Sequence, residues 1–125
     1  MKPQKRPVNL NIFTIRMPIP AIASILHRIS GIVLFLAIPY LLWILAQSLS
    51  SESNFLALHD DLSAPLPKLI LFMIAAPFIY HFIAGIRHLL MDINIGVELK
   101  SGRMTAIITI LLALVLTIMA GFYIW

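Results

Sequence analysis

Residues 21–48, AIASILHRISGIVLFLAIPYLLWILAQS, decide which kind of fold this chain adopts. Crossing the roughly 30 Å hydrocarbon layer of a bilayer takes about 20 helical residues, and this stretch is long and apolar enough. Residues 66–90 and 104–125 have the same character. A segment that crosses alone must be a helix, because each backbone polar group has to find its partner within that segment. The sequence therefore predicts an all-α integral membrane protein with three transmembrane helices.

Composition supports a single membrane domain over residues 1–125. Hydrophobic residues make up 61% of the chain and charged residues only 11%, far from the usual mix of a soluble domain. The absence of cysteine excludes disulfides and cysteine-ligated metals. The formal charge of +4 is compatible with nucleic-acid binding, but the basic residues flank the apolar spans, where topology explains them better. We expect membrane lipid around the chain and no nucleic acid.

The basic residues also predict the direction of each span. Residues 1–20 are rich in Lys and Arg, and so is the connection over residues 91–103, whereas residues 49–65 carry Glu52, Asp60 and Asp61. Because Lys and Arg accumulate on the inner side, the N-terminus and the second connection are predicted to be cytoplasmic. Residues 1–20 lack a compact apolar core before a cleavage site, so we interpret them as a retained cytoplasmic segment. The expected location is a cell inner membrane.

Polar residues of the first two spans are expected at one depth. Arg28 lies roughly 10 to 14 Å from the inner end of the first span, at 1.5 Å per residue. The second span runs the other way and places His81 about 16 Å from the same surface. Both depths fall in the inner half of the membrane.

The helical faces agree as well. Ser24, Arg28 and Gly31 share one side of the first helix, with His27 at its edge. The second span repeats the pattern with four residues on one face: His81, Gly85, His88 and Asp92. The spacing predicts a basic, imidazole-rich site between the two helices.

Plainer explanations stay open at this stage. Arg28 lies close enough to the inner surface to snorkel to the interface. His81 is compatible with an ordinary histidine hydrogen-bonded to a neighbouring helix. Small residues such as Ala84 and Gly85 commonly serve helix packing alone.

The residue types favour haem over other metal sites. Calcium and magnesium require oxygen ligands, which are scarce in these spans. A zinc site usually needs three converging protein ligands, and only His81 and His88 share a helical face. A haem macrocycle supplies four of its six iron ligands, so each axial position needs one residue. Its two propionates would give Arg28 and His27 anionic partners.

Two stretches carry a resemblance to a known family. They are RPVNLNIFTIRMPIPAIASILHRISG at residues 6–31 and YHFIAGIRHLLMD at residues 80–92. With the three-span layout, they resemble the cytochrome b membrane-anchor subunits of succinate dehydrogenase (respiratory complex II), of the bacterial type. The resemblance covers nearly the whole chain.

The resemblance implies a shared haem b. Such subunits form a heteromeric helical bundle with a second small three-span anchor, and the two hold a flavoprotein and an iron–sulfur protein at the membrane. One haem b lies between the anchors, with one axial histidine from each. In this chain that ligand is His81, and we expect no other histidine of this chain opposite it. His27, Arg28 and His88 are then candidates for the haem propionates.

The resemblance also implies a ubiquinone-reduction site with Ser24 and Arg28. A fixed cation and a hydroxyl donor stabilise the negative charge that develops on a quinone oxygen. Asp92 is a candidate proton relay, or alternatively the partner of His88 one turn away. The chain itself is not expected to oxidise succinate, because it has no dinucleotide-binding pattern and no cysteines for iron–sulfur clusters.

Three other functions stay open. One is a fumarate reductase anchor that works with menaquinone. Another is a purely structural anchor whose polar residues make subunit contacts. The last is a small proton-coupled transporter with His81 and His88 as a relay, although three unrelated spans show none of the internal symmetry common in transporters.

Overall fold

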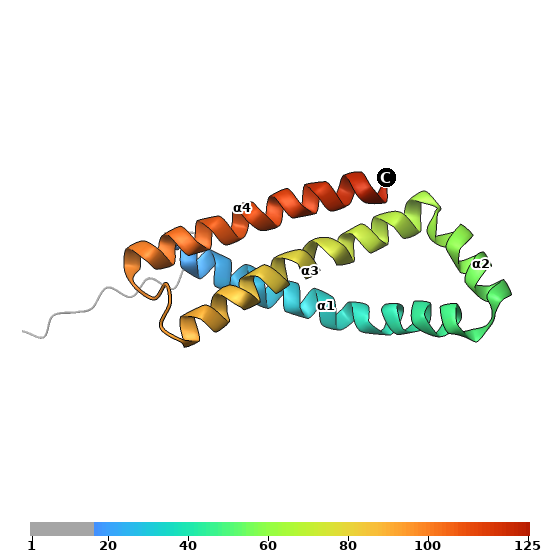
Figure 1. Ribbon diagram of the computed structural model, residues 1–125, viewed down its shortest axis with the longest axis horizontal. Helices are drawn as coiled ribbons and strands as arrows, with labels where there is room; N and C mark the ends of the chain where they lie inside the picture. The colour runs from blue at the N-terminus through green and yellow to red at the C-terminus, as the bar shows by residue number, and fades with distance from the viewer. Residues whose placement is uncertain (1–16) are drawn as a thin grey trace, which may run out of the picture.

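The computed structural model describes residues 17–125, which form four helices and no strand (Figure 1). Their bounds are Ile19–Ser50 for α1, Glu52–Leu62 for α2, Pro65–Asp92 for α3 and Leu99–Ile124 for α4. Of these, α1, α3 and α4 are long and apolar enough to cross a membrane. The predicted all-α class with three transmembrane helices is confirmed. Most of the segment predicted to be cytoplasmic, residues 1–16, lies outside the described residues.

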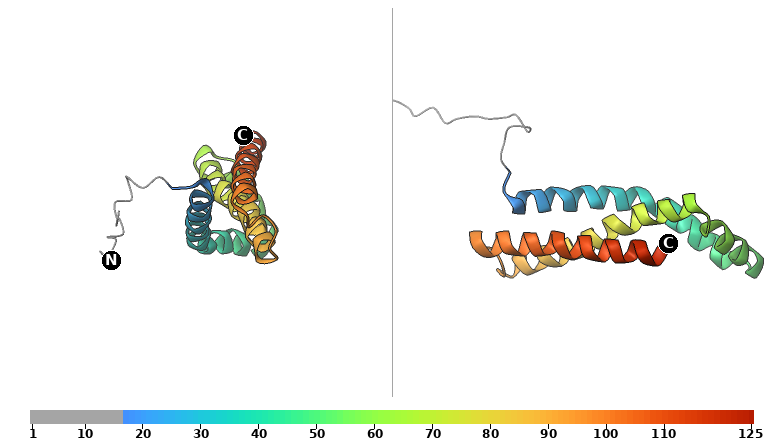
Figure 2. Two further views of the ribbon diagram at one scale, coloured as in Figure 1. Left: turned by 90° about the vertical axis from the view of Figure 1, so that its left-hand side faces the viewer. Right: turned by 90° about the horizontal axis from the view of Figure 1, so that it is seen from above.

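The three long helices form a bundle whose polar site lies where two of them cross. The start of α1, the end of α3 and the start of α4 lie at one end of the molecule, and α2 lies at the other (Figure 1). α3 packs against both α1 and α4. Figure 2 shows α3 crossing α1 at an angle, while α4 packs against α3. This crossing brings the first half of α1 against the second half of α3.

Small residues form the contacts between the helices. The buried apolar side chains of the three spans are all alanines, and every large apolar side chain retains some exposure. The alanines are Ala23, Ala37, Ala84, Ala106 and Ala113. Small side chains let helix backbones approach closely in a membrane, where lipid solvates the large apolar groups as well as a protein core does. The outward-facing Leu, Ile and Phe side chains are therefore suited to lipid or to other membrane helices.

α2 is an element that the sequence analysis missed, because it treated residues 49–65 only as an acidic connection. The Ser51 hydroxyl accepts a hydrogen bond of 3.1 Å from the backbone N–H of Asn54 and caps the helix. Glu52 in the first turn suits the positive end of the helix dipole. Leu58 is buried, whereas Phe55 and Leu56 are exposed. The serine cap and the acidic first turn were the signals that would have indicated a helix here.

The start of α4 packs closely against the turn that joins α3 to α4. Asn94 has a φ of 64° and Gly96 a φ of 77°, which are left-handed conformations that Asn and Gly tolerate best. A Cβ on Gly102 would lie 3.1 Å from the Gly96 carbonyl oxygen. A side chain at Gly102 would therefore push α4 away from this turn.

Candidate functional site

Three imidazole rings stack where α1 crosses α3. The His27 and His81 ring centroids lie 4.1 Å apart with an interplanar angle of 18°. On its other side His27 stacks on His88, with centroids 4.7 Å apart at 21°. The predicted meeting of the two polar turns at one level of the bundle is confirmed for these histidines.

This arrangement corrects one expectation from the sequence. His27 was placed at the edge of its helical face, and no other histidine of the chain was expected opposite His81. In the structure the His27 ring covers a face of the His81 ring. The α1–α3 crossing produces this contact, and the two small residues Ala23 and Ala84, each 1% exposed, are buried in the same part of the bundle.

His81 is fixed to α1 through one ring nitrogen. Its Nδ1 lies 3.1 Å from the Ser30 Oγ and 3.1 Å from the His27 carbonyl oxygen. A Cβ on Gly31 would lie 3.0 Å from the His81 Cε1, so the ring lies against the α1 backbone there. No described residue hydrogen-bonds to Nε2 of His81.

Tyr80 provides a second bond across the same crossing. Its hydroxyl donates a hydrogen bond of 2.8 Å to the carbonyl oxygen of Ala23. Because Ala23 is buried, this bond is shielded from competition by water. Tyr80 appeared in the sequence analysis only as part of the YHFIAGIRHLLMD stretch. The structure shows that this bond attaches Tyr80, the residue directly before His81, to α1.

His27 carries an unsatisfied nitrogen inside the stack. Its Nε2 is the one buried side-chain nitrogen or oxygen without a hydrogen-bond partner among the described residues. A Cβ on Gly85 would lie 3.7 Å from this atom, so the missing side chain of Gly85 leaves space beside it. An unpaired buried polar group costs about 1 to 3 kcal/mol. His27 Nε2 is therefore an atom to which a polar ligand or partner group would add a favourable bond.

His88 is held within its own helix. Its Nδ1 donates a hydrogen bond of 2.8 Å to the carbonyl oxygen of Ala84. The pairing with Asp92 considered from the sequence does not form. Among the described residues, one contact within 4 Å joins a basic side chain to a carboxylate, and it is His59 Nδ1 to Asp60 Oδ1 at 3.7 Å. The preceding turn of α3 satisfies His88 instead.

Ser24 and Arg28 lie on α1 outside the imidazole stack. Ser24 is half-buried and Arg28 is exposed. Within the described part of the chain, neither side chain makes a hydrogen bond or ion pair with another residue. Residues 17–125 therefore do not occupy the hydrogen-bonding groups of either side chain.

Arg87 is a buried residue whose place in the fold was not predicted from the sequence. It is only 6% exposed, and it reaches from α3 to α4. Its Nε donates to the Thr105 Oγ1 at 3.2 Å and its Nη2 to the Gly102 carbonyl oxygen at 3.3 Å. The sequence analysis used the basic residues here for topology only. A signal was present, because ionisable residues within spans usually face the bundle interior.

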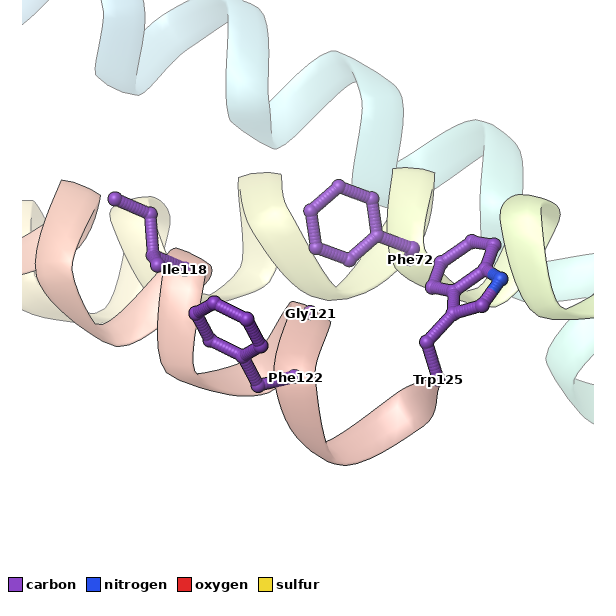
Figure 3. A pocket seen from close by; sticks show the side chains of 5 residues that line it. All are labelled: Phe72, Ile118, Gly121, Phe122 and Trp125. Carbon is purple, nitrogen blue, oxygen red and sulfur yellow. The ribbon is translucent and has the colours of Figure 1, made fainter.

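An apolar groove at the opposite end of α4 is separate from the histidine stack. It encloses about 530 Å³ and is lined by Phe72, Ile118, Gly121, Phe122 and Trp125 (Figure 3). The Phe72 and Trp125 rings meet edge to face with centroids 6.1 Å apart. The groove has no charged side chain and no histidine, so its lining is chemically unlike the histidine stack.

Comparison with known proteins decides the family. The family model described as "Succinate dehydrogenase/Fumarate reductase transmembrane subunit" matches residues 2–120, nearly the whole chain. The chain belongs to this family. The resemblance drawn from residues 6–31 and 80–92 is thereby confirmed, and this member of the succinate dehydrogenase anchor family is a multi-pass membrane protein.

Individual relatives agree with the family model. The chain is 37% identical over 122 residues to the succinate dehydrogenase cytochrome b556 subunit of Coxiella burnetii, covering 97% of this chain and 98% of the relative. It is 30% identical over 115 residues to the subunit of the same name from Rickettsia felis, covering 92% and 90% of the two chains. A third relative of that name, from Paracoccus denitrificans, is 31% identical over 98 residues, covering 78% and 75%.

Proposed function

We propose that this succinate dehydrogenase membrane-anchor subunit binds one haem b through His81 and contributes to a ubiquinone-reduction site. The observation that carries the proposal is the His81 ring at the α1–α3 crossing. Its Nδ1 is engaged by α1, and its Nε2 has no partner among the described residues. A neutral imidazole held by one nitrogen presents the other to a metal.

The other side chains at the crossing fit a haem. His27 and His88 lie beside His81, and the unpaired Nε2 of His27 would gain a partner from a carboxylate. Arg28, exposed on α1 one residue after His27, is proposed to reach a propionate from outside the stack. The three rings stack face to face, and no described cluster of His, Cys, Asp or Glu converges on a metal ion. This fits a macrocycle that brings four iron ligands of its own. Haem would supply one-electron transfer within the membrane.

The second axial ligand would come from a second small anchor subunit. His27 lies parallel to His81 at 4.1 Å, a ring-on-ring contact with no room for a macrocycle between the two. We therefore propose a haem shared between two chains. The same two anchors would hold the flavoprotein and iron–sulfur subunits at the cytoplasmic face of the inner membrane, where succinate is oxidised.

Ser24 and Arg28 are proposed to bind the quinone. The Arg28 guanidinium stays protonated even where water is scarce, so it holds a fixed positive charge for the quinone oxygen as that oxygen is reduced. The Ser24 hydroxyl donates a hydrogen bond to the same end of the ring. Both residues lie on α1 within one turn of His27, so a quinone bound there would have a hydroxyl donor and a positive charge close together. Asp92, exposed at the end of α3, is placed to exchange protons with water.

A reduced-minus-oxidised optical spectrum of the complex purified through this subunit tests the haem proposal. We expect a b-type spectrum in the unmodified complex and its loss or displacement in the His81→Ala variant. His59→Ala is the matched control, because His59 lies on α2 with its side chain 73% exposed. A spectrum unchanged by His81→Ala would remove His81 as the ligand, and a colourless unmodified complex would refute the haem proposal.

A fumarate reductase anchor is the second candidate, because the matched family includes both enzymes. The quinone that co-purifies with the complex separates the two. Ubiquinone supports the succinate dehydrogenase proposal, and menaquinone supports the alternative.

A further inference from the structure

We infer that Ser30 is a positioning residue for His81, which together with the His27 carbonyl sets the orientation of the ring and leaves its Nε2 free to bind a metal. The inference rests on the proposed role of His81 as a haem ligand. Three atoms carry it: the Ser30 Oγ, the His27 carbonyl oxygen and the His81 Nδ1. The hydroxyl lies 2.8 Å from the carbonyl oxygen, and Nδ1 lies 3.1 Å from each of the two oxygens.

The donors and acceptors in this triangle allow one assignment that satisfies all three contacts. The carbonyl oxygen only accepts, and the Ser30 hydroxyl has a single hydrogen, which it donates to that carbonyl. Facing Nδ1, Ser30 therefore presents a lone pair. A bare Nδ1 would face two oxygen lone pairs, so Nδ1 carries the hydrogen. A neutral imidazole has only one N–H, so Nε2 of His81 is the nitrogen with the free lone pair.

The second bond distinguishes Ser30 from an ordinary helical serine. Serines in helices commonly donate to a carbonyl of the preceding turn, as Ser48 does to Leu45 at 2.8 Å. Ser30 makes the same local bond and also contacts a ring on another helix. It is 5% exposed, so water does not compete for either bond. Among the described serines, this combination is unique to Ser30.

The neighbouring residue restricts the same ring. A Cβ on Gly31 would lie 3.0 Å from His81 Cε1, so the ring lies close to α1 at a position where any larger residue would press on it. The His27 ring covers one of its faces. Ser30 thus acts together with the His27 carbonyl, as a second acceptor for Nδ1–H, on a ring that His27 already covers on one face. The orientation of an axial imidazole influences the EPR spectrum of low-spin ferric haem, and the strength of its Nδ1–H bond influences the reduction potential.

The test compares Ser30→Ala with Ser48→Ala in the whole complex. Ser48 makes the same local bond near the other end of α1 with no second partner on another helix. Haem per complex, haem dissociation, the EPR spectrum and the midpoint potential are measured. Loss of such an outer partner typically weakens metal binding about 10- to 100-fold. We expect Ser30→Ala to dissociate haem faster by a factor of this order and to shift the EPR spectrum and the potential, while Ser48→Ala matches the unmodified complex.

A second pair of variants controls for assembly. Ser30→Thr and Ser30→Val have the same branched shape, but only threonine keeps the hydroxyl. We expect Thr to retain the haem signature and Val to lose it. Equal behaviour of Thr and Val, or a Ser30→Ala complex with unchanged haem dissociation, EPR and potential, would overturn the inference. If His81→Ala still removed the haem in that case, the proposed ligand would stand while the role of Ser30 would not.

Discussion

At the scale of single residues, α1 presents two chemically different surfaces within one turn and a half. Ser30 and the His27 carbonyl face α3 and hold His81, whereas Arg28 is exposed and free of described partners. A charged side chain within a span is costly and usually marks a functional pathway, and no described residue pairs with Arg28. We therefore expect Arg28 to act on a group that this chain does not contain.

Replacing Arg28 separates quinone chemistry from succinate oxidation. Arg28→Leu removes the fixed charge but keeps an apolar side chain on α1. Because loss of one such stabilising group typically costs about 10²- to 10³-fold in rate, we expect succinate–quinone activity to fall by that order. Succinate oxidation with a soluble dye acceptor should be largely unchanged.

Arg28→Lys is the control, because it keeps the charge but changes the geometry. It should lie between the unmodified complex and Arg28→Leu in quinone activity. If Arg28→Leu lowered dye-linked and quinone-linked activities equally, Arg28 would serve assembly rather than quinone binding.

At the scale of helices, the arginine on α3 organises the α3–α4 hairpin. Arg87 is buried and donates to the Thr105 hydroxyl and to the Gly102 carbonyl at the start of α4. The Thr105 hydroxyl also donates to that carbonyl at 3.2 Å. The start of α4 is therefore held to α3 by a small polar network, where lipid offers no competing hydrogen bonds.

Thr105→Val tests this network with almost no change in side-chain shape. Interhelical hydrogen bonds in membranes average about 0.6 kcal/mol and reach about 1.7 kcal/mol. We expect a loss of stability in that range, measured as a lower thermal midpoint of the purified complex. Thr117→Val, also on α4 and without a hydrogen bond to a described side chain, should leave the midpoint unchanged. Equal midpoints for both variants would contradict the role assigned to Arg87 and Thr105.

The sequence predicts the spans better than the contacts between them. Hydropathy and length suffice for α1, α3 and α4, because lipid selects for continuous apolar runs whatever the tertiary packing. Helical periodicity also brought His27, His81 and His88 to one level. It could not predict the stack itself, because ring contacts depend on the crossing angle and on how closely Ala23 and Ala84 approach. The contacts of Arg87 and the helical structure of α2 were not predicted either. Counting charged residues gives the direction of the spans, but it does not show which charged residue is buried or which connection is helical.

At the scale of the whole molecule, the two ends of the bundle differ in charge. The α2 end carries Glu52, Asp60 and Asp61 with Lys68, and the end with the α3–α4 turn carries Lys100 and Arg103 with Asp92 and Glu98. This asymmetry underlies the proposed orientation, with the second end in the cytoplasm. A chain without cysteine is well suited to test it, because each introduced thiol is the only one in the subunit.

Cysteine labelling tests the orientation directly. Ser53→Cys lies on α2 and Lys100→Cys near the start of α4, and both positions are exposed. With a membrane-impermeant maleimide on spheroplasts, we expect Ser53→Cys to react and Lys100→Cys to react only after permeabilisation. The reverse pattern would place the N-terminus and the quinone-binding end on the outer side and would contradict the proposed topology.

The alanine-lined contacts between the helices reverse the usual rule for tolerated mutations. In a water-soluble protein, large buried side chains tolerate few substitutions, whereas most surface positions tolerate many. Here the lipid-facing positions need only remain hydrophobic, so leucine, isoleucine and phenylalanine should replace one another freely there. At Ala23, Ala84 and Ala106, which are at most 1% exposed, one added methylene would wedge two helices apart. The buried alanines should therefore tolerate substitution least, although they have the smallest side chains in the spans.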